Sequence, residues 1–384
     1  MHIGLNAITL YPGAIGGMET YFRKLLHWLQ QIDNTNRYTV IYNEAYAADL
    51  PLFNPAFTMK TYRYEKKSFN WYVRGVLRNT LNIDPVRSRF KKLGLDLIHH
   101  PFNVLNPVSS GIPAVLTIND IQHEYFPDFF AASDLHKRRR LFKPSAMEAV
   151  RIIAISEFTR SCVVEKYGID TGKIEVIHIG CGEEYRPIDD PEGFEQIRTT
   201  YGLDRPFLYY PAGSWPHKNH SKLLAALKLL KERRQFDGML VLTGIAMRAQ
   251  DTLLAEIESL GLGSMVKVLG YLPYAELPYL YNLATLLVFP SLFEGFGIPL
   301  VEAMACGCPV ICSNRTALPE VAGAAGVLFE PLLPEDMAEK IWSVWDSAVE
   351  QQRLREAGFN RVKSFGWDGV ARKTAAVYEK AVRG

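Results

Sequence analysis

The sequence predicts an α/β protein with two domains, each built on a parallel β-sheet covered by helices. Short apolar runs alternate with helical patterns along the whole chain, which is typical of repeated βα units. With 384 residues the chain exceeds one ordinary α/β core. A glycine-rich stretch followed by acidic residues at 180–187 offers the best boundary. We therefore expect two Rossmann-like domains of similar size that face each other across a ligand-binding cleft.

Each expected strand is a short run rich in branched and aromatic residues between turn signals. In the first half these runs are 2–9, 38–42, 95–99, 114–118, 152–155 and 174–177, and in the second half 207–210, 239–243, 266–269, 286–289, 309–312 and 327–329. The expected helices between them include 18–30, 157–167, 220–234, 250–260 and 335–349. Each half thus holds enough strands for one doubly wound sheet.

The composition is that of a folded cytoplasmic enzyme, with 48% hydrophobic and 22% charged residues. A formal net charge of only +2 argues against a nucleic-acid partner. The five cysteines form no Cys-x-x-Cys pair, so we expect buried thiols and no metal site. No run approaches the roughly 20 apolar residues that span a bilayer, and the N-terminus begins as a strand rather than as a signal peptide. We expect a cytoplasmic protein, either free or associated with the cytoplasmic face of a membrane.

The most informative segment, FPSLFEGFGIPLVE at 289–302, follows an expected strand and contains two carboxylates, Glu294 and Glu302. Its glycines let the backbone approach a ligand, and the short helix expected from Pro299 leaves free N–H groups that favour an anion. Carboxylates accept paired hydrogen bonds from vicinal hydroxyls, such as those of a sugar ring or a ribose. A turn residue and a solvated helix face are the alternative, but the two glutamates in this context favour a ligand site.

This segment resembles the Glu-x7-Glu signature of the retaining glycosyltransferases of family four, which have the two-domain GT-B fold. The continuations AMACGCPV at 303–310 and ALPEV at 317–321 are also similar to that family. The resemblance covers essentially the whole chain and is most specific in the second half. It implies transfer of a sugar from a nucleoside-diphosphate sugar, with no metal and no cofactor.

The resemblance also assigns roles to residues of this segment. Glu294 would hydrogen-bond the hydroxyls of the donor sugar, and Glu302 would hydrogen-bond the ribose. The backbone amides of Phe296, Gly297 and Ile298 would meet the sugar and the diphosphate.

A second segment, PAGSWPHKNH at 211–220, lies between an expected strand and an expected helix. A lysine at such a turn can neutralise a diphosphate leaving group as charge develops on it. In the family a basic pair performs this role, and Lys218 matches its lysine, whereas His217 stands where arginine is common. A solvated surface lysine is the alternative for Lys218. Structural or supporting roles fit His217 and His220 equally well.

The loop YPGAIGGMET at 11–20 follows the first expected strand and is not a dinucleotide fingerprint, because positions that would need glycine hold Ile15 and Met18. This argues against a nicotinamide enzyme. In the family a Gly-Gly loop at this place, Gly16 and Gly17 in this chain, brings backbone N–H groups to the donor phosphate. A plain tight turn is the alternative.

A fourth segment, LTINDIQHEYFP at 116–127, ends another expected strand. The family commonly has His-Asp here, with the histidine near the transferred sugar, whereas this chain has Asn119-Asp120. Asn119 can hydrogen-bond the sugar but cannot titrate. His123 lies four residues further on and fits either the acceptor side of the site or an ordinary structural role.

Basic and aromatic side chains interleave in two clusters of the first half, and such clusters fit an anionic lipid-linked acceptor or a membrane surface as well as a solvated face. The first cluster contains Trp71, Tyr72, Arg74, Arg78, Arg87, Arg89, Lys91 and Lys92, and the second contains residues 136–140 and Lys143.

Together these observations predict a retaining glycosyltransferase that moves a sugar to a glycan or lipid-linked acceptor. The kind of relatives that the chain resembles favours mannose as the sugar and GDP-mannose as the donor. Residues 1–182 would bind the acceptor and 183–366 the nucleotide sugar, with the last helix, 367–384, crossing back onto the first domain. A GT-B phosphorylase, a nucleotide-sugar epimerase and a catalytically silent nucleotide-sugar-binding protein are the alternatives. The last is kept open by Asn119, which replaces the family's histidine.

Overall fold

The computed structural model describes residues 1–12, 16–63, 69–80 and 84–383. Its contacts divide the chain into two compact units: unit 1 is Met1–Ile179 together with the segment from Trp367 onward, and unit 2 is Gly180–Gly366. Each unit has its own sheet and its own buried core.

Unit 1 contains a seven-stranded sheet in the order β3-β2-β1-β4-β5-β6-β7, and every neighbouring pair is parallel. The order reverses between β1 and β4, so the carboxyl ends of these two strands lie side by side at a topological switch point. The strands are β1 His2–Asn6, β2 Arg37–Asn43, β3 Phe57–Tyr62, β4 Leu97–His100, β5 Ala114–Ile118, β6 Arg151–Ala154 and β7 Ile174–Val176.

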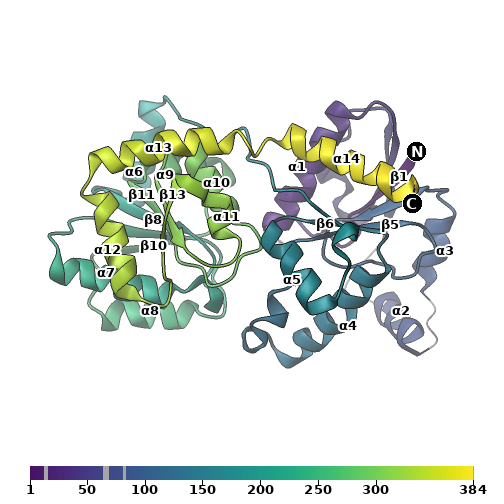
Figure 1. Cartoon of the computed structure of the whole chain (residues 1–384), viewed down its shortest axis with the longest axis horizontal. Helices are drawn as coiled ribbons and strands as arrows, with labels where there is room; N and C mark the ends of the chain where they lie inside the picture. Colours follow the sequence, from purple (N-terminus) through teal and green to yellow (C-terminus); the bar gives the residue numbers. More distant parts are fainter. Residues whose placement is uncertain (13–15, 64–68, 81–83, 384) are drawn as a thin grey trace. The chain divides into compact units, whose positions relative to one another are not determined.

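The helices of unit 1 cover both faces of this sheet. The last helix, α14, packs beside α1 on one face and returns the end of the chain to the first unit, while α4 and α5 cover the other face (Figure 1). The phenol of Tyr378 on α14 lies 2.7 Å from His99 Nδ1 on β4, which ties this helix to the sheet. The helices are α1 Gly17–Ile32, α2 Phe69–Thr80, α3 Pro85–Lys91, α4 Ala132–Glu148, α5 Glu157–Tyr167 and α14 Trp367–Arg383.

Unit 2 repeats the same topology with six parallel strands in the order β10-β9-β8-β11-β12-β13. Its switch point lies between β8 and β11. The strands are β8 Phe207–Pro211, β9 Met239–Thr243, β10 Val266–Gly270, β11 Leu286–Phe289, β12 Val310–Ser313 and β13 Gly326–Phe329.

In unit 2, helices α7, α8 and α12 lie on one side of the sheet, and α9, α10 and α13 lie on the other (Figure 1). The helices are α6 Pro191–Tyr201, α7 His220–Arg233, α8 Gln250–Ser259, α9 Leu277–Leu283, α10 Ile298–Ala305, α11 Leu318–Ala322, α12 Pro334–Trp345 and α13 Ala348–Val362.

The predicted α/β class with parallel sheets is confirmed, and the differences lie in particular elements. The first strand ends at Asn6 instead of residue 9, because the Asn6 side chain accepts a hydrogen bond from the Ile8 backbone N–H and turns the chain. The helix expected at 335–349 ends at Trp345, and Ser347 caps a new helix by accepting from the Glu350 N–H. Strand β3 was not predicted: it is an edge strand with a mixed, half-exposed pattern.

Candidate active site

The switch point of unit 2 brings together the two loops in which the sequence predicts donor-binding residues. The loop after β8 carries Lys218, and the loop after β11 carries Glu294. Hydrogen bonds fix these loops to each other: the Leu292 N–H donates to the His217 carbonyl at 2.8 Å, and Asn219 Nδ2 donates to the Pro290 carbonyl at 3.1 Å. The two loops therefore form one rigid platform at the carboxyl edge of the sheet.

On this platform Lys218 and Glu294 form an ion pair. The distance from Lys218 Nζ to Glu294 Oε1 is 2.5 Å, and the two side chains are 17% and 15% exposed. Burial alone would raise the pKa of the Glu294 carboxyl, but the charge of Lys218 and the hydrogen bonds around it outweigh burial and hold that pKa below its ordinary value. The structure thus brings together two residues that the sequence predicted separately, and it presents an ionised carboxylate beside a cation.

A glycine begins the helix that follows Glu294. Gly297 has φ +111°, and a Cβ at this position would lie 2.7 Å from Leu318 Cδ2, so both the backbone angle and the space require glycine. Ile298 is the first residue of α10, one position earlier than expected. Phe296, before it, is buried and packs edge-to-face against Phe365 with ring centroids 5.7 Å apart. The start of α10 is therefore anchored on an aromatic contact.

Glu302, one turn into α10, is almost completely buried. Its side chain is only 8% exposed, and its Oε2 accepts a hydrogen bond of 2.6 Å from the Tyr281 phenol on α9. Burial raises the pKa of the Glu302 carboxyl to about 7, although the tyrosine hydrogen bonds work in the opposite direction. Tyr281 in turn packs edge-to-face against Tyr185 and Tyr209. Sequence reasoning missed these tyrosines, because no spacing pattern links α9 to a carboxylate 21 residues later.

A cavity of about 740 Å³ lies in unit 2 close to this cluster. Tyr274 and Glu184 line it. Glu184 contributes to the raised pKa of Glu302, and Tyr274 contributes to the raised pKa of Tyr185. The remaining lining residues are Arg186, Pro187, Ile188, Asp189, Asp190, Ala275, Pro278 and Tyr279.

His217 stands beside Lys218 on the same platform. Burial lowers the pKa of its imidazole to about 4, and the nearby Lys218 charge acts in the same direction. A neutral histidine here cannot supply the second positive charge that a basic pair would supply. His220, at the start of α7, is buried and packs against the Tyr210 ring with centroids 4.9 Å apart.

The remaining predicted residues belong to unit 1. Gly16 has φ +51° and is exposed at the start of α1, whose first residue is Gly17; a Cβ on Gly16 would meet nothing within 4 Å. The expected loop also includes residues 13–15, which lie outside the described part of the chain. Asn119 is buried after β5, where its backbone N–H donates to Asn103 Oδ1 at 2.6 Å and its amide to the Pro101 carbonyl at 3.3 Å.

His123 is fully buried in unit 1. Its ring lies edge-on to Phe142 with centroids 4.7 Å apart, and its Nε2 is 3.4 Å from the Tyr167 phenol. Burial, reinforced by the charges of Arg138 and Arg139, lowers the pKa of this imidazole to about 4. The ring is thus enclosed by aromatic side chains.

In the described ranges no group of three or more histidine, cysteine, aspartate or glutamate side chains is placed to hold a metal ion. No described helix is both long enough and apolar enough to cross a membrane.

Two doubly wound sheets of the same strand order, each with polar residues at its switch point, define a protein of the GT-B glycosyltransferase fold. The solved structure of Anabaena HepE with UDP and glucose matches 99% of this chain and all of its own with a TM-score of 0.75 at 20% identity. The family model of the glycosyltransferase family 4 matches residues 15–184, and that of the glycosyl transferases group 1 matches 195–361. The chain belongs to the family-four glycosyltransferases.

Several relatives are mannosyltransferases by name, including two from Escherichia coli. The O-antigen chain mannosyltransferase B of Escherichia coli is 29% identical over 266 residues, which cover 69% of this chain and 70% of that protein. The serotype-specific mannosyltransferase WbdA of Escherichia coli is 32% identical over 251 residues, which cover 62% of this chain. This match spans only about a third, 31%, of the length of WbdA. The chain is accordingly a glycosyltransferase.

Proposed function

We propose that the chain transfers a mannosyl group from GDP-mannose to a glycan acceptor with retention of the anomeric configuration. The names of the two relatives support the mannosyl group, and the family supports a nucleoside-diphosphate donor. The observation that carries the proposal is the Lys218–Glu294 ion pair at the switch point of unit 2, because open α/β sheets bind their ligands at this place.

The two charges suit the two ends of such a donor. Glu294 is ionised and accepts hydrogen bonds, as sugar hydroxyls require, while the Lys218 ammonium attracts the diphosphate. The helix start at Gly297 adds N–H groups that favour the same anion by about 0.3–1 kcal/mol. Glu302 would accept from the ribose hydroxyls through the carboxylate that Tyr281 holds in place.

In the proposed reaction the bond between C1 of the sugar and the β-phosphate oxygen breaks, and the electron pair stays on the phosphate. Lys218 and the N–H groups of α10 stabilise this growing charge. The acceptor hydroxyl forms the new bond to C1 on the face that the phosphate leaves, and its proton passes to the departing phosphate oxygen. The protein supplies no covalent nucleophile in this route.

The experiment compares GDP-mannose with UDP-glucose, UDP-galactose and GDP-fucose as donors to octyl α-mannoside. We expect product only, or at least tenfold faster, with GDP-mannose, and an α-linkage in the one-bond C1–H1 coupling of the product. Preference for a uridine donor would overturn the proposed donor, and a β-linked product would overturn retention. Absence of product with every donor would overturn the proposed reaction with this acceptor.

We further propose that α4 holds a lipid-linked acceptor at an anionic membrane surface. Its exposed cations are Lys137, Arg139, Arg140 and Lys143, and the exposed His136 lies beside them. Arg138 pairs with Asp134 at 3.0 Å and stacks on the Phe130 ring at 4.6 Å, so it fixes the helix. Arg139 Nε lies 3.8 Å from Glu124 Oε2. Clustered cations contribute about 1 kcal/mol each near such a surface.

The first basic cluster of the sequence is used differently. Arg74 is paired with Asp84 at 2.7 Å, and Arg87 Nε donates to the Val108 carbonyl at 2.9 Å, so both hold the local fold. The side chains of Trp71 and Arg78 lie outside the described part of the chain. Arg89, Lys91 and Lys92 of this cluster are exposed. The proposed membrane contact is placed on α4, where the exposed cations are more numerous.

Flotation with vesicles tests the proposed membrane contact. The variant R139E/R140E/K143E should lose binding to phosphatidylglycerol vesicles, while the control K222E/K231E/R233E, on exposed positions of α7, should retain it. Equal binding of both variants to phosphatidylglycerol vesicles would contradict the role of α4. Equally strong binding of wild type to vesicles made only of phosphatidylcholine would contradict it as well.

A further inference from the structure

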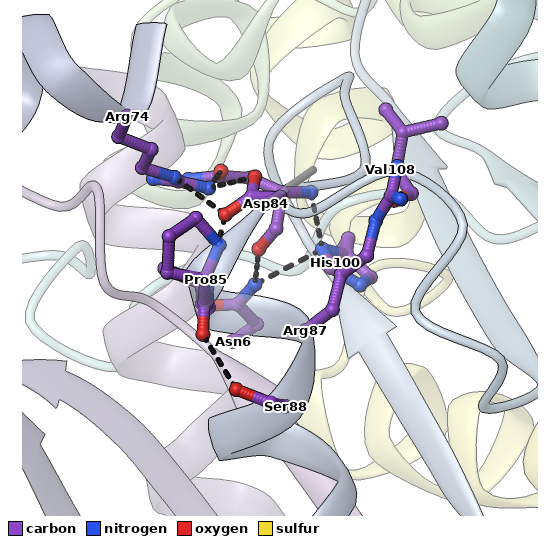
Figure 2. A network of polar contacts seen from close by, with 10 residues as sticks. Asn6, Arg74, Asp84, Pro85, Arg87, Ser88, His100 and Val108 are labelled. Atoms are coloured by element: carbon purple, nitrogen blue, oxygen red, sulfur yellow. Dashed lines mark hydrogen bonds and ion pairs between the residues drawn. The ribbon is translucent and has the colours of Figure 1, made fainter. Parts of the chain in front are cut away.

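A network of polar side chains lies at the switch point of unit 1 (Figure 2). Asn6 ends β1 and His100 ends the neighbouring strand β4, so both stand at the carboxyl edge of the sheet. Asn6 Nδ2 donates to the Asn106 carbonyl at 2.6 Å and lies 3.1 Å from His100 Nδ1. None of these residues has a role in the donor site of unit 2.

The network fixes the tautomer of His100. The backbone N–H of Asn106 donates to His100 Nδ1 at 3.2 Å, and a backbone N–H cannot act as an acceptor. Nδ1 therefore carries the lone pair, and the proton of the neutral ring lies on Nε2. Burial lowers the pKa of this imidazole to about 3, so the ring is neutral at physiological pH.

This arrangement leaves one N–H group without a partner. His100 is 2% exposed, and its Nε2 has no hydrogen-bond partner among the residues that the structure describes. An unsatisfied buried donor is costly, typically about 1–3 kcal/mol, so folded proteins rarely retain one without a use. The neighbouring His99 shows the ordinary case: its Nδ1 lies 2.7 Å from the Tyr378 phenol and its Nε2 2.8 Å from Thr117 Oγ1.

The described surroundings of His100 are polar and include a paired guanidinium and carboxylate. Arg74 donates two hydrogen bonds to the Asp84 carboxylate, at 2.8 and 2.7 Å, and a third to Asn106 Oδ1 at 2.6 Å. The carboxylate thus compensates the guanidinium (Figure 2), and Arg74 holds Asn106 in the position that sets the tautomer. A neutral, hydrogen-bonding environment suits a sugar hydroxyl better than a phosphate or a carboxylate.

We propose that His100 donates a hydrogen bond from Nε2, directly or through one bound water, to a hydroxyl oxygen of the glycan acceptor. The inference rests on the proposed glycosyl transfer and adds a specificity residue to its acceptor side. Asn119, the first residue after β5, stands at the same edge of the sheet and offers a second polar group there. Arg74 and Asn106 act as positioning residues, since they hold His100 without reaching the acceptor.

The first test uses kinetics with octyl α-mannoside and GDP-mannose. His100→Asn retains an acceptor for the Asn106 N–H but lacks the distal donor, so we expect its KM for octyl mannoside to rise at least fivefold. The KM for GDP-mannose should not change. His100→Gln places an N–H near the lost Nε2 and should recover part of the affinity. His99→Asn is the matched control, and it should lower stability without changing the KM for octyl mannoside.

The second test needs no variant activity. Long-range ¹H–¹⁵N spectra of histidine-labelled wild type should show the Nε2–H tautomer of His100. The His100 resonances are assigned by comparison with the spectrum of His100→Asn or, if that variant does not fold, of His100→Gln. That resonance should move when octyl mannoside is added, and the His99 resonance should not.

The outcomes are distinguishable. Transfer by wild type together with an unchanged KM for octyl mannoside in His100→Asn would overturn the inference. An Nδ1–H tautomer of His100 in wild type would overturn it as well. Either result would leave a structural histidine that holds a buried water. No transfer by wild type would overturn the proposed reaction with this acceptor, and the inference with it.

Discussion

Lys218 Nζ lies 2.5 Å from Glu294 Oε1, although 76 residues separate the two along the chain. The contact exists because β8 and β11 are parallel neighbours in the sheet, so the loops that follow them begin at the same edge. Both side chains are mostly covered, which strengthens their attraction compared with an exposed pair. In the proposed complex each partner would exchange this contact for a part of the donor. Without the donor, each holds the other's charge in place.

The ion pair should contribute to stability in a way that depends on pH. We expect a double-mutant cycle of Lys218→Met and Glu294→Gln, measured by urea unfolding at pH 7, to give a coupling free energy of about 0.5–3 kcal/mol. The pair lowers the pKa of Glu294 in the folded state. Its stabilisation should therefore be present above the ordinary carboxyl pKa and disappear as the pH falls through the lowered value. A coupling that does not change between pH 7 and the onset of acid unfolding would contradict this account.

Replacing Lys218 by alanine should reduce turnover more than donor affinity. The charge on the leaving diphosphate is larger in the transition state than in the bound donor, so its stabilisation appears mainly in kcat. Initial rates and GDP-mannose affinity by calorimetry would be measured on one preparation. Lys228→Ala is the control; this lysine lies on α7, is half-buried and pairs with Glu232 at 3.7 Å. A loss confined to affinity would make Lys218 a simple anion contact.

Glu302 should make nucleotide affinity depend on pH. Its pKa is raised to about 7 by burial, whereas ribose hydroxyls donate to the ionised form. Below about pH 7 protonation should therefore compete with binding, and the affinity for GDP should fall by up to tenfold per pH unit. Above that pH the affinity should level off.

A matched variant isolates this effect, since GDP itself also titrates. Glu302→Gln cannot ionise, so the ratio of wild-type to variant affinity should rise between pH 5.5 and 7 and then stay constant. Calorimetry at several pH values gives both affinities. A ratio independent of pH would show that Glu302 does not change its protonation when GDP binds.

Much of the fold was predictable because buried strands leave a local signal. The runs at 114–118, 239–243 and 286–289 coincide with β5, β9 and β11, whose residues are all buried. β3 left no such signal, because Lys60 and two threonines interrupt its apolar residues at the edge of the sheet. Sequence periodicity reports burial, and an edge strand is only half buried.

The sequence named candidate residues for the site, but it could not show which of them are in contact. Glu294 and Lys218 were recognised separately, since each lies in a loop with its own pattern, whereas their pairing depends on which strands become neighbours. Tyr281 and His100 were not recognised. Their positions depend on partners that are distant in sequence. Of the adjacent residues His99 and His100, the contact with Tyr378 shows that His99 is the one that faces α14.

Glu294→Gln separates binding of the sugar from binding of the nucleotide. The amide keeps the size of the side chain but removes its charge, so it accepts weaker hydrogen bonds from the sugar hydroxyls. It also leaves Lys218 without its carboxylate partner, which frees the ammonium for the diphosphate. We therefore expect GDP affinity to remain nearly intact or to rise slightly, while transfer falls about 10²-fold, equivalent to ~2.7 kcal/mol. Glu339→Gln, which removes an exposed ion pair with Arg234 in the same unit, should change neither quantity. Calorimetry with GDP and initial rates of transfer to octyl mannoside, both on one preparation, decide the matter: unchanged transfer would refute a role for Glu294 on the sugar, and lost GDP affinity would place this carboxylate on the nucleotide instead.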